Sequence, residues 1–144
     1  MLSPTDGSPG METVIEHAVS LARVHGATLH GLYVVNTAAL TDLPMESSWE
    51  GVNQALQEEG RAALGEIERL AKDLPLELSQ VDGSPAREIV DYAEEEGIDV
   101  IVMGTHGRSG VDRLLLGSVA ERVVRSSTVP VLTIRVETPE SGSD

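Results

Sequence analysis

Residues 98–110 read IDVIVMGTHGRSG, and the tripeptide Leu116-Gly117-Ser118 follows shortly after. The first six residues are almost entirely apolar, as expected for a strand that is buried on both faces of a parallel sheet. The three glycines that follow allow positive φ angles and a close approach of the backbone to a ligand. Gly117-Ser118 opens a helical pattern, and the N–H groups at a helix start favour an anion. A strand, a glycine-rich loop and a helix start in this order predict a phosphate-binding site.

The spacing of these glycines excludes two common phosphate-binding motifs. The loop has no Gly-Lys-Ser/Thr, so it is not a Walker A loop. Its glycines follow the pattern Gly104-x2-Gly107-x2-Gly110, which differs from the Gly-x-Gly-x2-Gly fingerprint of dinucleotide-binding domains. The alternative to ligand binding is a glycine-rich loop that only turns the chain from a strand into a helix.

Apolar periodicity predicts strands and helices that alternate along the chain. Strands are expected at 1–5, 28–35, 76–81, 98–103 and 129–134, and the apolar positions of helices at 14–22, 56–71, 86–93 and 118–124. Gly26 is the expected C-cap of the first helix. The tetrapeptide Asp-Gly-Ser-Pro precedes two of these helices, at 6–9 and 82–85, and its Ser-Pro pair is typical of an N-cap and a first-turn proline. The alternation predicts one α/β domain over residues 1–136, a single open parallel sheet with helices on both faces. Residues 137–144 are polar and are expected to form a disordered acidic tail.

The composition limits the classes of protein and of site. The 144 residues contain no Cys, which excludes disulfides, thiolate zinc sites and cysteine nucleophiles. No apolar run approaches the ~20 residues that a membrane-spanning helix needs. No charged segment followed by an apolar one opens the chain as a leader would. The sequence therefore predicts a cytoplasmic protein without a membrane partner.

The charge is strongly acidic. There are 24 Asp and Glu against 10 Lys and Arg, a formal charge of −14, and Lys72 is the single lysine. Such a surface repels nucleic-acid phosphates and anionic lipids, so nucleic acid is not an expected partner. An acid-rich and lysine-poor composition is typical of the cytoplasmic proteins of salt-accumulating halophiles, with an ordinary acidic mesophilic protein as the alternative.

Two strand ends carry residues that suit a ligand. In an open α/β sheet, ligands bind beyond the carboxyl ends of the strands, where the strand order reverses. The first strand ends in Pro4-Thr5-Asp6-Gly7-Ser8, and the fourth ends in Gly104. Asp6 is either a ligand contact or only a turn carboxylate, since Asp-Gly is a common turn pair. His106 has no carboxylate partner in the sequence, which disfavours a role as a general base.

The spacing of the remaining histidines gives no reason to expect a metal site, and none of them is a predicted catalytic residue. His17, His25 and His30 do not show the spacing of metal ligands.

The pattern Gly104-x2-Gly107-x9-Gly117-Ser118 resembles the nucleotide-binding signature of the universal stress protein family, in its ATP-binding branch. The family's opening Pro-Thr-Asp-Gly-Ser resembles residues 4–8, and its closing Ser-x-x-Pro-Val-Leu resembles residues 127–132. The resemblance implies an adenine nucleotide alpha hydrolase-like fold with strand order 3-2-1-4-5. Family members have several apolar residues before Pro-Thr-Asp, whereas this chain has only Met1, Leu2 and Ser3. Either the central strand is short or the natural start lies upstream.

The resemblance also implies a nucleotide-binding set. Asp6 would accept hydrogen bonds from the ribose or adenine side, the backbone of Val34 would meet adenine, and Gly117 would border the phosphates. The full set is Pro4, Thr5, Asp6, Val34, Met103, Gly104, Gly107, Arg108, Gly117, Ser118 and Val119. For Arg108, the alternative is a side chain that points into solvent.

The resemblance implies a nucleotide-responsive regulator that acts in a stress response and binds ATP with Mg²⁺. Any ATP hydrolysis is expected to be slow, because no positioned base and no lysine accompany the predicted phosphates. One alternative is an adenylating enzyme of the related adenine-nucleotide alpha hydrolase class, although the Ser-Gly-Gly-x-Asp-Ser typical of those enzymes is absent. The other alternative is a nucleotide-free dimeric adaptor. The resemblance further implies a homodimer through the last strand, Val129–Val136.

Overall fold

The computed structural model describes residues 1–37, 49–106 and 116–136. The strands are β1 (Leu2–Thr5), β2 (Leu29–Asn36), β3 (Leu76–Gly83), β4 (Ile101–Gly104) and β5 (Val131–Ile134). They form one sheet in the order β3-β2-β1-β4-β5, and every pair is parallel. The predicted α/β class and the strand order 3-2-1-4-5 are therefore confirmed.

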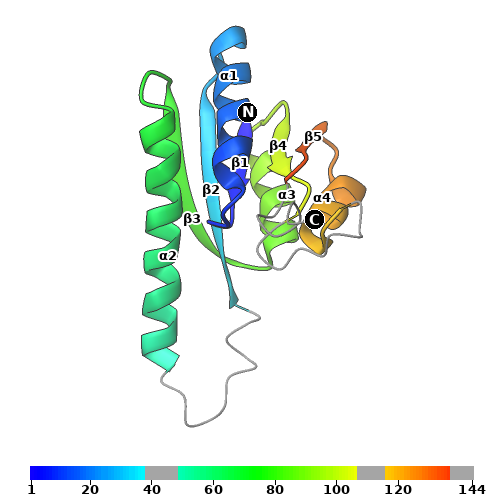
Figure 1. The fold of residues 1–144 in the computed structure, drawn as a ribbon. Helices are drawn as coiled ribbons and strands as arrows, with labels where there is room; N and C mark the ends of the chain where they lie inside the picture. The colour runs from blue at the N-terminus through cyan, green and yellow to red at the C-terminus, as the bar shows by residue number, and fades with distance from the viewer. Residues whose placement is uncertain (38–48, 107–115, 137–144) are drawn as a thin grey trace, which may run out of the picture.

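The helices cover both faces of this sheet (Figure 1). They are α1 (Met11–His25), α2 (Trp49–Leu70), α3 (Pro85–Glu95) and α4 (Ser118–Ser126). Buried residues of α1 and α2 share one core cluster, and those of α3 and α4 share another. The two helix pairs therefore lie on opposite faces, and β1, buried along its whole length, lies in the middle of the sheet.

The residues of β1 and β4 divide between these two cores by alternation, as strand geometry requires. Leu2 and Met103 pack on the α3/α4 side, and Val102 packs on the α1/α2 side. The described core is almost purely aliphatic and includes one tyrosine, Tyr33, which is buried against α1 and α2. No helix in the described ranges combines the length and the apolar composition that a membrane crossing requires.

Several predicted boundaries are wrong by two or three residues. The helix after Ser8-Pro9 begins at Met11 with Gly10 as its N-cap, and the main-chain oxygen of Ser8 accepts a hydrogen bond from the Met11 N–H (3.0 Å). The fourth strand begins at Ile101 and the fifth at Val131, later than the apolar runs that predict them. By contrast, Gly26 closes α1 in the left-handed conformation as predicted (φ 62°). The tail at 137–144 lies outside the described residues.

Candidate functional site

The chain turns sharply where β1 ends, and two side chains of the predicted set stabilise the turn. The hydroxyl of Thr5 accepts a hydrogen bond from the Gly7 N–H (3.1 Å), and Oδ1 of Asp6 accepts one from the Ser8 N–H (2.9 Å). Gly7 has a φ of 74°, which favours glycine at this position. The turn role considered for Asp6 is therefore present. A carboxylate can accept several hydrogen bonds, so the turn role of Asp6 and a contact with a ligand are compatible.

Pro4 limits the pairing between β1 and β4. The Leu2 N–H donates to the carbonyl of Val100 (3.0 Å), so by alternation Pro4 is the next β1 residue that faces β4. Proline has no N–H and cannot continue this ladder. The register between the two strands is the single pair Leu2↔Ile101, whereas β1 pairs with β2 over all four of its residues. The ladder between β1 and β4 thus stops short of their carboxyl ends, where the ligand crevice is predicted.

The backbone of Val34 lies near the carboxyl end of the neighbouring strand β2. The His30 N–H donates to the Met1 carbonyl (2.8 Å), so by alternation the N–H and C=O of Val34 also face the β1 side of β2. The last pair between β1 and β2 is Thr5↔Tyr33, and Val34 lies one residue beyond it. The contact of this backbone with adenine stays a prediction.

The start of α4 is tied directly to the end of β4. The Gly117 N–H donates a hydrogen bond of 2.6 Å to the carbonyl of Thr105, the residue after β4. Gly117 is the buried N-cap and has no side chain with which to cap the helix, and Ser118 is exposed. The first-turn N–H groups of α4 can therefore meet an anion.

The backbone conformation of Gly117 does not itself require glycine. Its φ is −71° and its ψ is 171°, an extended conformation that any residue adopts. A positive φ therefore does not require glycine here, and the case for glycine at this position rests on space for a ligand alone.

Three of the other predicted residues, Met103, Val34 and Val119, pack on the α3/α4 side. Met103 is buried there, and Val34, Leu116 and Val119 pack against the same cluster. Gly104 lies at the end of β4, and a Cβ placed on it would lie 2.9 Å from Cγ2 of Val136. Gly107 and Arg108 lie outside the described residues.

Thr105, directly after β4, is a residue near the predicted site that the sequence did not predict. It is buried, and its hydroxyl accepts a hydrogen bond from the Val136 N–H (3.2 Å) and lies 3.1 Å from Nδ1 of His106. The available signal was a hydroxyl residue directly after the buried strand, inside the glycine-rich segment.

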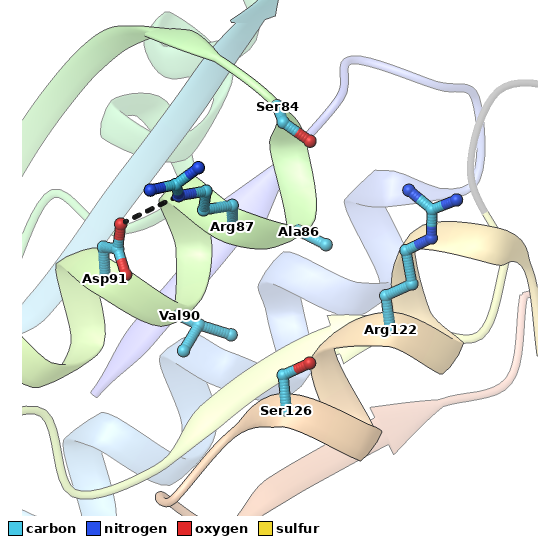
Figure 2. A pocket seen from close by; sticks show the side chains of 7 residues that line it. All are labelled: Ser84, Ala86, Arg87, Val90, Asp91, Arg122 and Ser126. Atoms are coloured by element: carbon cyan, nitrogen blue, oxygen red, sulfur yellow. Dashed lines mark ion pairs between the residues drawn. The ribbon is translucent and has the colours of Figure 1, made fainter.

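A separate pocket of about 270 Å³ lies between α3 and α4. Figure 2 shows its lining, in which Arg87 pairs with Asp91 at 3.9 Å. The lining residues are Ser84, Ala86, Arg87, Val90, Asp91, Arg122 and Ser126, none of which belongs to the predicted nucleotide-binding set. This pocket is therefore lined by other residues than the ligand crevice predicted at the strand ends.

Side chains suited to a metal ion are not clustered in the part of the chain that the structure describes. No group of three or more His, Cys, Asp or Glu residues there has the arrangement of a metal site. A magnesium ion in the crevice would be held mainly by the oxygens of its ligand and by water, as Mg²⁺ commonly is.

Comparison with known proteins finds relatives across nearly the whole chain. The model of the universal stress protein family matches residues 1–135. A universal stress protein of Methanocaldococcus jannaschii is 40% identical over 134 residues, covering 92% of this chain and 79% of the relative. The solved structure of the Methanocaldococcus jannaschii protein MJ0577 superposes with a TM-score of 0.80 at 30% identity, covering 95% of each chain.

Two more distant structures share the fold and contain adenine nucleotides. A universal stress protein in complex with cAMP has a TM-score of 0.68 at 24% identity, with 94% of this chain and 95% of the other covered. The universal stress protein of Archaeoglobus fulgidus in complex with dAMP has a TM-score of 0.64 at 22% identity, with 92% and 94% covered. With a parallel sheet in the order 3-2-1-4-5 and a family match from end to end of the sheet, this chain belongs to the universal stress protein family.

Proposed function

We propose that this protein binds ATP in the crevice between the carboxyl ends of β1 and β4 and acts as a nucleotide-responsive regulator. The observation that carries the proposal is the start of α4. Its N-cap Gly117 is hydrogen-bonded to the residue that follows β4, and as a glycine it places no side chain over the first-turn N–H groups. Asp6, at the end of the neighbouring strand β1, supplies a carboxylate at the same sheet edge. The cAMP and dAMP complexes of two family members support an adenine nucleotide as the ligand.

The residues divide between the two ends of this ligand. Asp6 and the backbone of Val34 would contact the nucleoside, with Pro4 and Thr5 on the same wall. Gly117 and the first turn of α4 would meet the phosphates through main-chain N–H groups. Met103, Gly104, Gly107, Arg108, Ser118 and Val119 complete the proposed site. Mg²⁺ would screen the phosphate charge through phosphate and water oxygens.

The adenylating-enzyme alternative makes a different prediction. It requires release of pyrophosphate when a carboxylate or amine substrate is added with ATP. The turn after β1 uses Thr5 and Asp6 oxygens for its own N–H groups and carries a single glycine. We therefore expect ATP to be retained without rapid turnover, measured as pyrophosphate and ADP release over hours.

Titration calorimetry in molar KCl with ATP, ADP and inorganic triphosphate tests the proposal. Gly117→Val places a side chain where the phosphates should lie, so it should abolish binding of ATP and ADP while the circular dichroism spectrum is unchanged. Asp6→Ala removes charge-assisted hydrogen bonds worth about 1.5–3 kcal/mol, so it should weaken ATP by roughly one to two orders of magnitude. It should also reduce the discrimination between ATP and triphosphate.

Each variant has a matched control in the chain. Asp82→Ala changes the aspartate of the other Asp-Gly-Ser-Pro, on the edge strand β3, and should leave ATP affinity unchanged. Gly65→Val adds the same side chain within α2, where a Cβ meets nothing within 4 Å. If Gly117→Val and Asp6→Ala bind ATP like the unmodified protein, the crevice is only a turn. If the unmodified protein holds no nucleotide, the adaptor alternative is favoured.

We further propose that the protein is a homodimer paired through the edge strand β5. The strand order places β5 at an edge of the sheet, and Leu132 within it is 40% exposed. An apolar edge strand without a covering segment is prone to associate.

A further inference from the structure

Thr105 joins four segments of the chain at the carboxyl end of β4. Its N–H donates to the carbonyl of Ile134 in β5 (2.9 Å), and its carbonyl accepts from the N–H of Gly117 (2.6 Å). Its hydroxyl accepts from the N–H of Val136, which follows β5 (3.2 Å), and lies within hydrogen-bond distance of His106. The position of Thr105 therefore sets the relation between β4, the start of α4 and the chain after β5.

The side chain of Val136 packs closely against two glycines, Gly10 and Gly104. A Cβ on Gly104, at the end of β4, would lie 2.9 Å from Cγ2 of Val136, and a Cβ on Gly10, the N-cap of α1, would overlap Cγ1 of the same side chain. Val136 also packs against the core between the sheet and helices α1 and α2. This packing holds the Val136 N–H in place beneath the hydroxyl of Thr105.

We propose that Thr105 is the residue that positions the start of α4 for the phosphates of the ligand, and that Val136, seated between Gly10 and Gly104, holds Thr105 in place. The reasoning is geometric. The Gly117 N–H is hydrogen-bonded to the Thr105 carbonyl, directly after β4. The Thr105 hydroxyl is hydrogen-bonded to the N–H of Val136, whose side chain is packed against Gly10 and Gly104. A shift of Val136 would be passed through Thr105 to Gly117. This inference rests on the proposed nucleotide function, and Thr105 itself need not touch the ligand.

Three variants separate this role from general stability. Thr105→Val keeps the shape of the side chain and removes the hydroxyl, which leaves the Val136 N–H without its acceptor. Thr105→Ser restores the hydroxyl. Thr133→Val makes the same chemical change in β5, at the register partner of Met103, and is the control for the loss of a threonine in this sheet.

Comparing the affinities for ATP and for adenosine, which has no phosphates, isolates the effect of a variant on phosphate binding. Loss of one hydrogen bond should weaken ATP about 3- to 10-fold in Thr105→Val. Adenosine binding should change less than about 2-fold, because the nucleoside end is formed by β1 and β2. Thr105→Ser should restore ATP affinity, and Thr133→Val should not change it. Equal weakening of ATP and adenosine, or unchanged ATP affinity, would overturn the positioning role.

Hydrogen exchange in the ligand-free protein provides a readout that does not depend on nucleotide binding. In Thr105→Val the amides of both Val136 and Gly117 should exchange faster, whereas in Thr133→Val neither should. Gly10→Ala, which must displace Val136, should reproduce the effect at both amides. If the exchange rate of the Gly117 amide is unchanged in Thr105→Val, the proposed coupling between Thr105 and Gly117 is wrong, even if the protein binds ATP. If the exchange rates change as expected but the unmodified protein binds neither ATP nor adenosine, the proposed function fails while the structural link stands.

Discussion

Among single residues, Ser3 is the clearest conflict between a side chain and its surroundings. It lies in β1, the central strand, opposite Gly31 of β2, and it is fully buried. Within the part of the chain that the structure describes, its hydroxyl has no hydrogen-bond partner. A buried polar group without a partner costs about 1–3 kcal/mol of stability.

Removing that hydroxyl should therefore stabilise the protein. We expect Ser3→Ala to raise the free energy of unfolding by about 1 kcal/mol, measured by urea denaturation in molar KCl. Ser127→Ala is the matched opposite, because the Ser127 hydroxyl donates to the Val129 carbonyl (2.7 Å) and accepts from the Val129 N–H (2.9 Å). It should lower the free energy of unfolding. A loss of stability in Ser3→Ala would show that its hydroxyl is satisfied in solution.

The site residues show what a motif predicts and what it leaves open. The glycine spacing and the Pro-Thr-Asp segment predict residues that follow the carboxyl ends of β1 and β4, and these two strands are parallel neighbours in the sheet. The use of individual atoms was not predictable. Pro4 was expected as a wall residue, but its missing N–H also interrupts the β1–β4 ladder, which depends on the register between the strands. The direction in which a backbone N–H points depends on which strands pair and in which register, and local composition does not predict this.

At the level of elements, two identical tetrapeptides lead into their helices differently. In the second Asp-Gly-Ser-Pro, Pro85 begins α3 directly after the N-cap Ser84, as predicted. In the first, Asp6 bonds to the Ser8 N–H and Thr5 to the Gly7 N–H, and the helix starts later, at Met11. Asp82 instead accepts a hydrogen bond from Gln57 of α2 (3.4 Å). The same letters give different turns because tertiary neighbours decide which N–H groups the carboxylate reaches.

The strand boundaries differ from the prediction for a related reason. Ile98 is buried and apolar, yet its N–H bonds to Ala93 and completes the end of α3 rather than a strand. An apolar run reports which residues are buried, whereas a strand also requires a paired neighbour. The strand order itself was expected only from the family resemblance, because alternation of strands and helices is compatible with several orders.

An ion pair between two helical segments gives a pH-dependent prediction. Arg23, in the last turn of α1, makes two hydrogen bonds of 3.0 Å to the carboxylate of Asp73, just after α2. The hydrogen bond from Arg23 holds the pKa of Asp73 below its ordinary value of 3.8. Because folding lowers the pKa of Asp73, the ion pair stabilises the folded protein fully at pH values above the ordinary pKa. This stabilisation is lost as the pH falls through the lowered pKa. Arg23→Gln should therefore reduce stability slightly at pH 7, and the difference from the unmodified protein should vanish as the pH falls through the lowered pKa of Asp73.

Urea unfolding of both proteins at several pH values would measure this difference. Arg61→Gln, an exposed arginine on α2, is the control for loss of one positive charge. A difference that persists unchanged at low pH would mean that Arg23 acts through packing and not through the Asp73 carboxylate.

For the whole molecule, the net charge of −14 is the dominant feature. Like charges on one compact surface repel, and the screening length falls to about 3 Å at 1 M salt. We therefore expect the melting temperature at pH 7 to rise substantially from low salt to molar KCl. The same titration near pH 4.5, the pI of the sequence, is the control, because there the net charge is close to zero and the salt effect should shrink. A flat melting temperature at pH 7 would contradict the halophilic interpretation of the composition.

The assembly of two chains is the last prediction, and the edge strand β5 is where the fold allows it. Val131 packs into the α3/α4 core, so its replacement would damage the fold, whereas Leu132 is 40% exposed and is the better probe. Sedimentation in molar KCl should give twice the chain mass of 15.3 kDa. Leu132→Lys places a charge on the proposed interface and should give the single-chain mass. Val24→Lys, on the outer surface of α1 at a side chain 78% exposed, should leave the dimer intact. A dimer that survives Leu132→Lys would place the interface elsewhere, and a monomeric unmodified protein would end the proposal.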